Sequence, residues 1–206
     1  MRPFFGFIYH QQIAFAEVGR QAVMADPDWR QGRYYDRECR PERGLAVARM
    51  LGHITYMSEQ SMEEKFSRRS AVSDYTFSFT AEFEVEKYLR YRGDSFVKRF
   101  DANSYLYITK AMDYFDVSDD RLFGRAGNVL PRFLVISFAS DWLYPASQSR
   151  ELVRMIKMHR GDASYCEIAS TYGHDAFLLE VEEQTRLIRP FLERIATEVD
   201  HGTFRS

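Results

Sequence analysis

The chain has 206 residues, of which 45% are hydrophobic, enough to bury one sizeable core. Its 28 basic and 30 acidic residues leave a net charge of −2, which argues against nucleic acid as a partner because phosphate binding needs clustered Lys and Arg. No run reaches the roughly 18 apolar residues of a membrane helix, so we expect no membrane span. Two distant cysteines, Cys39 and Cys166, predict neither a disulfide framework nor a metal site. Because the opening residues lack the features of a secretory signal, we expect a cytoplasmic protein.

The sequence from about His10 to Arg125 has a helical pattern. We predict four helices there: Gln11–Met24, Gly44–Phe66, Val85–Tyr91 and Ser95–Phe115. An Asp-Pro-Asp turn at 26–28 ends the first helix, and Asp94 is placed to cap the last. In the second helix, apolar residues recur every three to four positions and predict one buried stripe, formed by Val47, Met50, Leu51, Ile54, Met57 and Met62.

The pattern changes after Pro131. Strands are predicted at Arg132–Phe138 and Ser164–Ile168, with helices at Ser147–Met158 and Asp175–Ala196. This alternation implies parallel strands joined by a right-handed crossover. Two strands are too few for an independent sheet, so the pattern indicates the latter part of a larger α/β domain. We therefore divide the chain into a helical region, 1–130, and a strand-helix-strand-helix region, 131–206.

Asp141 and His174 lie in the turns that follow the two predicted strands. An acid and then a histidine at successive strand ends is the chain order of α/β-hydrolases, in which the nucleophile comes earlier. Histidine can activate a hydroxyl group near neutral pH, and a carboxylate on its other ring nitrogen fixes the tautomer. The alternative is structural: Asp141 caps a turn and His174 lies in an ordinary loop.

Longer strings around these residues resemble homoserine O-acetyltransferases, which transfer an acetyl group from acetyl-CoA. The strings that carry the resemblance are IAFAEVGRQAVMADPDWR, GLAVARMLGHITYMSEQSMEEKF, YLRYRGDSFVKRFDANSYLYITKAMDYFD, FLVISFASDWLYPASQS and YGHDAFLLE. Together they cover nearly everything from about Ile13 to Glu193. The resemblance implies the C-terminal part of an α/β-hydrolase fold with a helical lid before Pro131, and a homodimer formed through the lid helices.

The resemblance also assigns roles to individual residues. Asp141 matches the acid and His174 the base of the catalytic triad, while Asp175 matches the residue that holds the substrate amino group. Arg49 matches the arginine that binds the homoserine carboxylate, and Tyr56 a tyrosine of the same pocket. Arg49 and Tyr56 are seven positions apart, so the helical period independently places them on one face. Without the resemblance, that face would be interpreted as a solvated stripe.

The chain departs from the family because it contains neither a Gly-X-Ser-X-Gly nucleophile motif nor the family's oxyanion-hole loop. A triad enzyme without its serine loses about 10⁶ in rate, so we expect little activity from this chain alone. The function implied is homoserine O-acetyltransferase, with L-homoserine and acetyl-CoA as substrates, no further cofactor, no metal, and a place in methionine biosynthesis. Three alternatives are a non-catalytic dimerisation or binding remnant, a homoserine O-succinyltransferase, and an esterase-like hydrolase.

Overall fold

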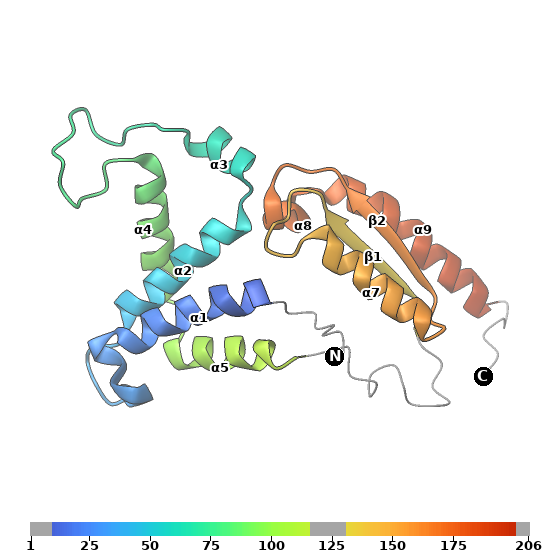
Figure 1. The fold of residues 1–206 in the computed structure, drawn as a ribbon, viewed down its shortest axis with the longest axis horizontal. Helices are drawn as coiled ribbons and strands as arrows, with labels where there is room; N and C mark the ends of the chain where they lie inside the picture. Colours follow the sequence, from blue (N-terminus) through green and yellow to red (C-terminus); the bar gives the residue numbers. More distant parts are fainter. Residues whose placement is uncertain (1–9, 116–130, 201–206) are drawn as a thin grey trace. The chain divides into compact units, whose positions relative to one another are not determined.

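The computed structural model describes residues 10–115 and 131–200, which form two compact units with these ranges (Figure 1). The first unit is helical and the second combines helices with two strands. The boundary expected between residues 130 and 131 lies at the end of segment 116–130, outside the described residues.

The helical unit contains five α-helices and one 3₁₀ helix in its described part. They are α1 (His10–Ala25), η1 (Pro27–Gly32), α2 (Glu42–Tyr56), α3 (Glu59–Phe66), α4 (Glu84–Val97) and α5 (Ala102–Asp113). The predicted turn at 26–28 is confirmed, since Asp26 caps η1 by accepting a hydrogen bond from the Asp28 amide at 3.0 Å. The packing of this unit is dominated by α2, which lies against both α1 and α4.

The prediction of one helix over Gly44–Phe66 is wrong, because the chain leaves the helical conformation at Met57. Met57 has an extended backbone, with φ −98° and ψ 143°. Ser58 then begins α3 as its N-cap, accepting a hydrogen bond from the Ser61 amide at 2.9 Å. A serine that caps a new helix competes with continuation of the old one, and the apolar periodicity across the break did not reveal it.

The predicted break at Gly93 and Asp94 is also wrong, since α4 continues through both residues to Val97. The cap of α5 is instead Asp101, whose Oδ2 accepts from the Ser104 amide at 2.8 Å. Gly93 serves packing: a Cβ there would lie 3.0 Å from the Ala46 Cβ and 3.1 Å from the Ala46 carbonyl oxygen. The glycine lets α2 and α4 approach closely and does not end a helix.

The buried face of α2 also differs from the predicted apolar stripe. Val47 and Ile54 are exposed, whereas Leu45 and Ala48 are buried. The core of the helical unit is formed by Val23, Tyr34, Leu45, Ala48, Phe96 and Ala102. Small residues on α2 therefore decide which face packs, because they allow the neighbouring helices to come near.

Gly44 is the point at which α2 meets the backbone of α1. A Cβ at this position would lie 2.3 Å from the Ala22 carbonyl oxygen and 2.7 Å from the Val23 Cα. The Gly44 amide also donates a 2.8 Å hydrogen bond to the Asp26 carboxylate.

We expect Gly44→Ala to lower the free energy of unfolding by about 1–3 kcal/mol, because the clashing atoms belong to the backbone and cannot rotate away. Gly52→Ala is the control, since it lies in the same helix and its Cβ would come no closer than 3.4 Å to Tyr56. That variant should be neutral or stabilising by up to about 1 kcal/mol from helix propensity. Denaturant unfolding of both variants checks the comparison, and equal stabilities would contradict it.

The α/β unit follows the predicted order. Its elements are β1 (Phe133–Phe138), α7 (Ala146–Met158), β2 (Ala163–Ile168), η2 (Gly173–Asp175), α8 (Ala176–Leu179) and α9 (Val181–Asp200). The two strands are parallel, as predicted, with Phe133 opposite Ala163 and Phe138 opposite Ile168. The single helix predicted over Asp175–Ala196 is instead divided into η2, α8 and α9, with a change of direction at Glu180.

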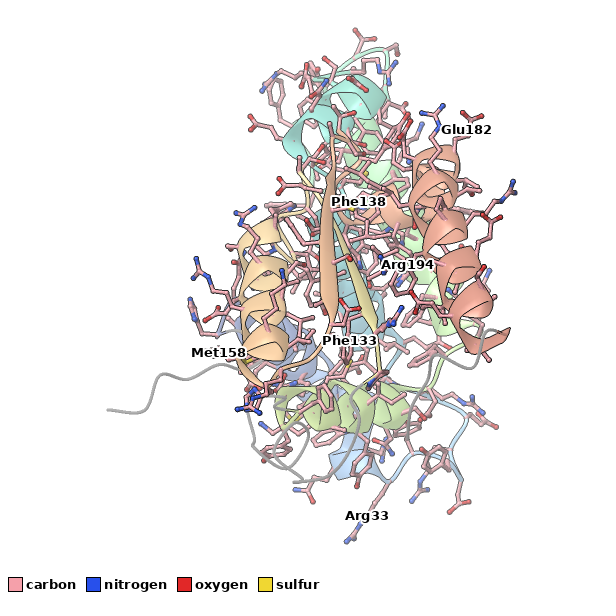
Figure 2. The ribbon with its side chains drawn as sticks, turned by 90° about the vertical axis from the view of Figure 1, so that its right-hand side faces the viewer. Arg33, Phe133, Phe138, Met158, Glu182 and Arg194 are labelled. Carbon is pink, nitrogen blue, oxygen red and sulfur yellow. The ribbon has the colours of Figure 1, made fainter. Side chains whose placement is uncertain are left out.

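The two faces of this strand pair are covered by different helices. On one face, Phe133, Val135 and Ala163 pack against Val153 and Ile156 of α7. On the other face, a cluster forms from Ile136, Phe138, Ile168, Ala176 and Leu187. Figure 2 shows the strands between α7, which ends at the labelled Met158, and α9, which carries Glu182 and Arg194. This three-layer arrangement fixes the strand ends from which Asp141 and His174 emerge.

None of the helices in the described part of the chain combines the length and the apolar character needed to cross a membrane.

Candidate active site

Asp141 is held in the loop that follows β1. The Ala139 amide donates to the Ile168 carbonyl at 3.0 Å, extending the pairing of the two strands beyond Phe138. The Asp141 amide then donates to the Phe138 carbonyl at 3.1 Å and closes a tight turn. The Asp141 side chain is buried, and its Oδ1 accepts a hydrogen bond from the Tyr144 amide at 2.8 Å. One carboxylate oxygen is therefore fixed by the backbone of its own loop.

His174 lies on the 3₁₀ turn η2, after β2. Gly173, directly before it, has a φ of +70°, a conformation that favours glycine. Ala176, two residues later, is fully buried in the cluster with Phe138 and Ile168, which anchors the turn to the sheet. The imidazole lies beside two aromatic rings, with centroids 5.1 Å from Tyr144 and 5.2 Å from Phe177.

The two loops bring the carboxylate and the imidazole into direct contact. His174 Nδ1 lies 2.8 Å from Asp141 Oδ2, as expected from their positions after neighbouring strands. The Asp141 side chain is 6% exposed and the His174 side chain 26%. A buried carboxylate on Nδ1 orients the ring and stabilises its protonated form, which makes Nε2 the nitrogen through which the ring can exchange a proton. This geometry is suited to general acid-base chemistry.

The other residues singled out from the sequence fall in both units. Asp175 is half-buried and directly follows His174 at the end of η2. Arg49 and Tyr56 lie on α2 in the helical unit, with the Arg49 guanidinium carbon 5.6 Å from the centre of the Tyr56 ring. The prediction that these two share one helix face is confirmed. The structure thus brings Asp141, His174 and Asp175 together in one unit and Arg49 with Tyr56 in the other.

The α2 face that carries Arg49 differs from a solvated stripe. Arg49 is half-buried and lies over the Phe96 ring, 4.8 Å from its centre. Within the described residues it forms an ion pair with no carboxylate. An arginine held by aromatic rings keeps its planar donors available for a carboxylate of a small molecule.

His53 belongs to the same face but is buried, and its Nδ1 lies 3.0 Å from the Tyr88 hydroxyl group. Burial, together with the positive charges of Arg49, Arg92 and Lys65, lowers the pKa of His53 to about 4. The ring is therefore neutral at pH 7, and its burial and its contact with Tyr88 indicate a packing role.

Sequence reasoning missed two aromatic residues that lie next to the His174 imidazole. Tyr144 and Phe177 lie beside the imidazole, the first from the loop after β1 and the second from α8. Their positions, three residues after each member of the pair, carry a weak signal, since residues three apart in a turn lie close together. Among residues 10–115 and 131–200, no group of three or more His, Cys, Asp or Glu side chains is arranged to hold a metal ion.

Comparison with known proteins identifies the relatives of the chain. It is 56% identical over 187 residues to homoserine O-acetyltransferase from Bradyrhizobium diazoefficiens. This match covers 89% of this chain and 47% of that protein. It is 52% identical over 198 residues to the Caulobacter vibrioides enzyme of the same name, covering 93% and 51% of the two chains. The chain belongs to the homoserine O-acetyltransferase family. It spans about half the length of the curated relatives it matches. No protein-family model matches it.

Solved structures establish the fold of this family member. A homoserine O-acetyltransferase from Bacillus anthracis superposes with a TM-score of 0.72 at 21% identity, covering 86% of this chain and 48% of that one. Esterase E22 gives a TM-score of 0.74 at 20% identity, covering 89% and 50%. The helical unit and the strand pair are consistent with the C-terminal part of an α/β-hydrolase fold, as predicted.

Proposed function

We propose that this chain supplies the acid-base pair and the acceptor-binding residues of a homoserine O-acetyltransferase. The observation that carries the proposal is the 2.8 Å contact between His174 Nδ1 and the buried Asp141 carboxylate. The high identity to proteins named homoserine O-acetyltransferase selects this reaction among those that the fold can support. The reaction is acetyl-CoA plus L-homoserine giving O-acetyl-L-homoserine and CoA.

In the proposed mechanism, the nucleophile is a serine. It belongs to the half of the relatives that this chain does not span. His174 Nε2 takes the serine proton while the serine oxygen attacks the acetyl carbonyl, and it returns that proton to the departing CoA thiolate. His174 then takes the proton of the homoserine hydroxyl group, whose oxygen attacks the acetyl-serine ester. The proton finally passes to the serine oxygen as it leaves. Asp141 stays ionised throughout and stabilises the imidazolium formed in each half-reaction.

The acceptor is recognised by its two charged groups in this proposal. Arg49 binds the homoserine carboxylate through its planar fork, Tyr56 lines the same pocket, and Asp175 binds the ammonium group. These roles are supported by the available guanidinium of Arg49 and by the position of Asp175 next to the base. The reaction requires no resident cofactor beyond the acetyl-CoA donor. We further propose a cytoplasmic enzyme of methionine biosynthesis that forms a homodimer through its lid helices.

Two other reactions are alternatives. A homoserine O-succinyltransferase would use the same acceptor residues with a different acyl donor. Hydrolysis of esters is favoured by the likeness to esterase E22, in which water would take the place of the amino-acid acceptor. A non-catalytic role in dimerisation would require neither donor nor acceptor.

The proposal is tested by joining this chain to the other half of the Bradyrhizobium relative and measuring release of CoA. We expect turnover that depends on L-homoserine and produces O-acetyl-L-homoserine, with acetyl-CoA preferred to succinyl-CoA. The 206-residue chain alone is the control and should give no homoserine-dependent release, since it carries no Gly-X-Ser-X-Gly motif. Preference for succinyl-CoA, or hydrolysis that is indifferent to homoserine, would select one of the alternatives.

A further inference from the structure

Ser140 connects the two loops that carry the acid-histidine pair. Its Oγ accepts a hydrogen bond from the Gly173 amide at 2.9 Å. Ser140 directly precedes Asp141, and Gly173 directly precedes His174. The Ser140–Gly173 hydrogen bond and the Asp141–His174 contact therefore join adjacent residues of the same two loops.

The Gly173 amide depends on this serine for a partner. Gly173 is buried, and its φ of +70° turns the backbone between β2 and η2. A buried amide without a partner costs free energy, so the hydroxyl group of Ser140 fixes the direction of this peptide. Because this peptide directly precedes His174, its orientation determines the position of the His174 side chain.

Three neighbouring hydrogen bonds have a different place in the structure. The Ala139–Ile168 bond joins the strands themselves, and the Asp141–Tyr144 bond lies within one loop. Ser170 accepts from the Tyr172 amide at 3.2 Å, again within one loop. The Ser140 hydroxyl group thus links the loop before Asp141 to a backbone amide of the turn that carries His174.

We propose that Ser140 is a positioning residue, whose hydroxyl group holds the turn of His174 so that Nδ1 meets the Asp141 carboxylate. The inference rests on the proposed function for its catalytic consequence, but the positioning itself concerns only the geometry of the α/β unit. Ser140 acts through Gly173 and His174 and does not touch the reacting atoms. Displacement of a catalytic group by about 1 Å lowers the reaction rate by up to about 10²-fold. Loss of a hydroxyl group that fixes the position of the imidazole should therefore lower the rate measurably.

The direct test is proton NMR of the purified 206-residue chain below its melting temperature. In the unsubstituted chain, the His174 Nδ1 proton should give a downfield signal because a carboxylate accepts it. Ser140→Ala should broaden or abolish that signal and accelerate exchange of the Gly173 amide. Ser140→Thr keeps the hydroxyl group and should restore both. Ser170→Ala is the matched control, because it removes a serine hydroxyl group from the same region without cutting a tie between the loops.

A second variant separates positioning from simple loss of stability. Ser140→Cys keeps the size of the side chain but makes it a weak acceptor, so it should fold and still weaken the His174 signal. The same variants can be measured in the completed enzyme, in which this chain is joined to the other half of the Bradyrhizobium relative. There, Ser140→Ala and Ser140→Cys should lower kcat by about 10–10²-fold with little change in KM for homoserine.

The outcomes distinguish this inference from the proposed function. A folded Ser140→Cys or Ser140→Ala chain with an unchanged His174 signal would overturn the positioning role, even if its melting temperature fell. If the signal responds as expected while the completed, unsubstituted enzyme transfers no acetyl group, the positioning role stands and the proposed reaction is wrong.

Discussion

Replacing His174 with alanine is expected to reduce acetyl transfer in the completed enzyme by about 10⁶-fold, the size of effect found when a triad base is removed. The reason is that one imidazole serves both half-reactions, taking the serine proton in the first and the homoserine proton in the second. Both the burst of CoA and the steady release of CoA should therefore disappear together. Stopped-flow measurement of thiol release checks both phases in one experiment.

Asp141→Asn tests the other member of the pair with less change in shape. An amide can fill the same buried position, but it has no charge to stabilise the imidazolium and its NH₂ favours the wrong tautomer of His174. We expect kcat to fall by about 10⁴-fold while the fold is retained.

The control for both substitutions is His159→Ala, in the same unit. His159 follows α7, where its Nδ1 lies 2.9 Å from the Met155 carbonyl oxygen, and it belongs to no proposed catalytic contact. It should leave the rate within a few-fold of the unsubstituted enzyme. A His174→Ala enzyme that retained either phase, or a His159→Ala enzyme that lost both, would contradict the assignment.

The sequence predicted the α/β unit more accurately than the helical one. Each strand is a short, continuous apolar run bounded by turn residues, and such runs can be recognised without knowing what packs on them. Parallel pairing then follows from the strand-helix-strand order, because a right-handed crossover leaves one arrangement. The contact between Asp141 and His174 was predictable for the same reason, since both residues lie in the turns that follow paired strands.

The helical unit was harder to predict because its packing depends on small residues. Gly93 resembles a helix breaker in the sequence, but it lies inside α4, where Ala46 leaves no space for a side chain. The buried face of α2 is defined by Gly44, Leu45 and Ala48, which hydrophobic periodicity underweights beside Val47 and Ile54. Whether a glycine interrupts a helix or lets another helix approach is decided by tertiary contacts, which are not encoded in local patterns.

The tie between Ser140 and Gly173 could not be predicted from composition or spacing. Both residues are common in loops, and the bond depends on how two separate turns meet. In the sequence, Ser140 is distinguished only by its position next to Asp141. A hydrogen bond from a backbone amide to a side chain across loops requires coordinates for both partners.

Arg49→Ala tests the proposed binding of the acceptor and should separate the two halves of the reaction. Arg49 is proposed to bind the homoserine carboxylate, so its loss should raise KM for homoserine by about ten- to a hundred-fold, as expected for a charge-assisted pair. Formation of the acetyl-serine, seen as a CoA burst, should persist because the arginine does not touch the acyl donor. Arg49→Lys should recover part of the affinity, since an ammonium group cannot reproduce the two parallel hydrogen bonds of the guanidinium.

The matched control is Arg99→Ala, because both arginines contact the same aromatic ring. The Arg49 guanidinium carbon lies 4.8 Å from the centre of the Phe96 ring and that of Arg99 lies 5.2 Å from it. Arg99 is exposed and lies beyond the end of α4, whereas Arg49 shares its helix face with Tyr56. If KM rises only for Arg49→Ala, the effect belongs to the carboxylate and not to a loss of cation-aromatic packing. Equal effects of the two variants, or loss of the CoA burst with Arg49→Ala, would assign Arg49 to the structure of the helical unit and leave the homoserine carboxylate to be bound elsewhere.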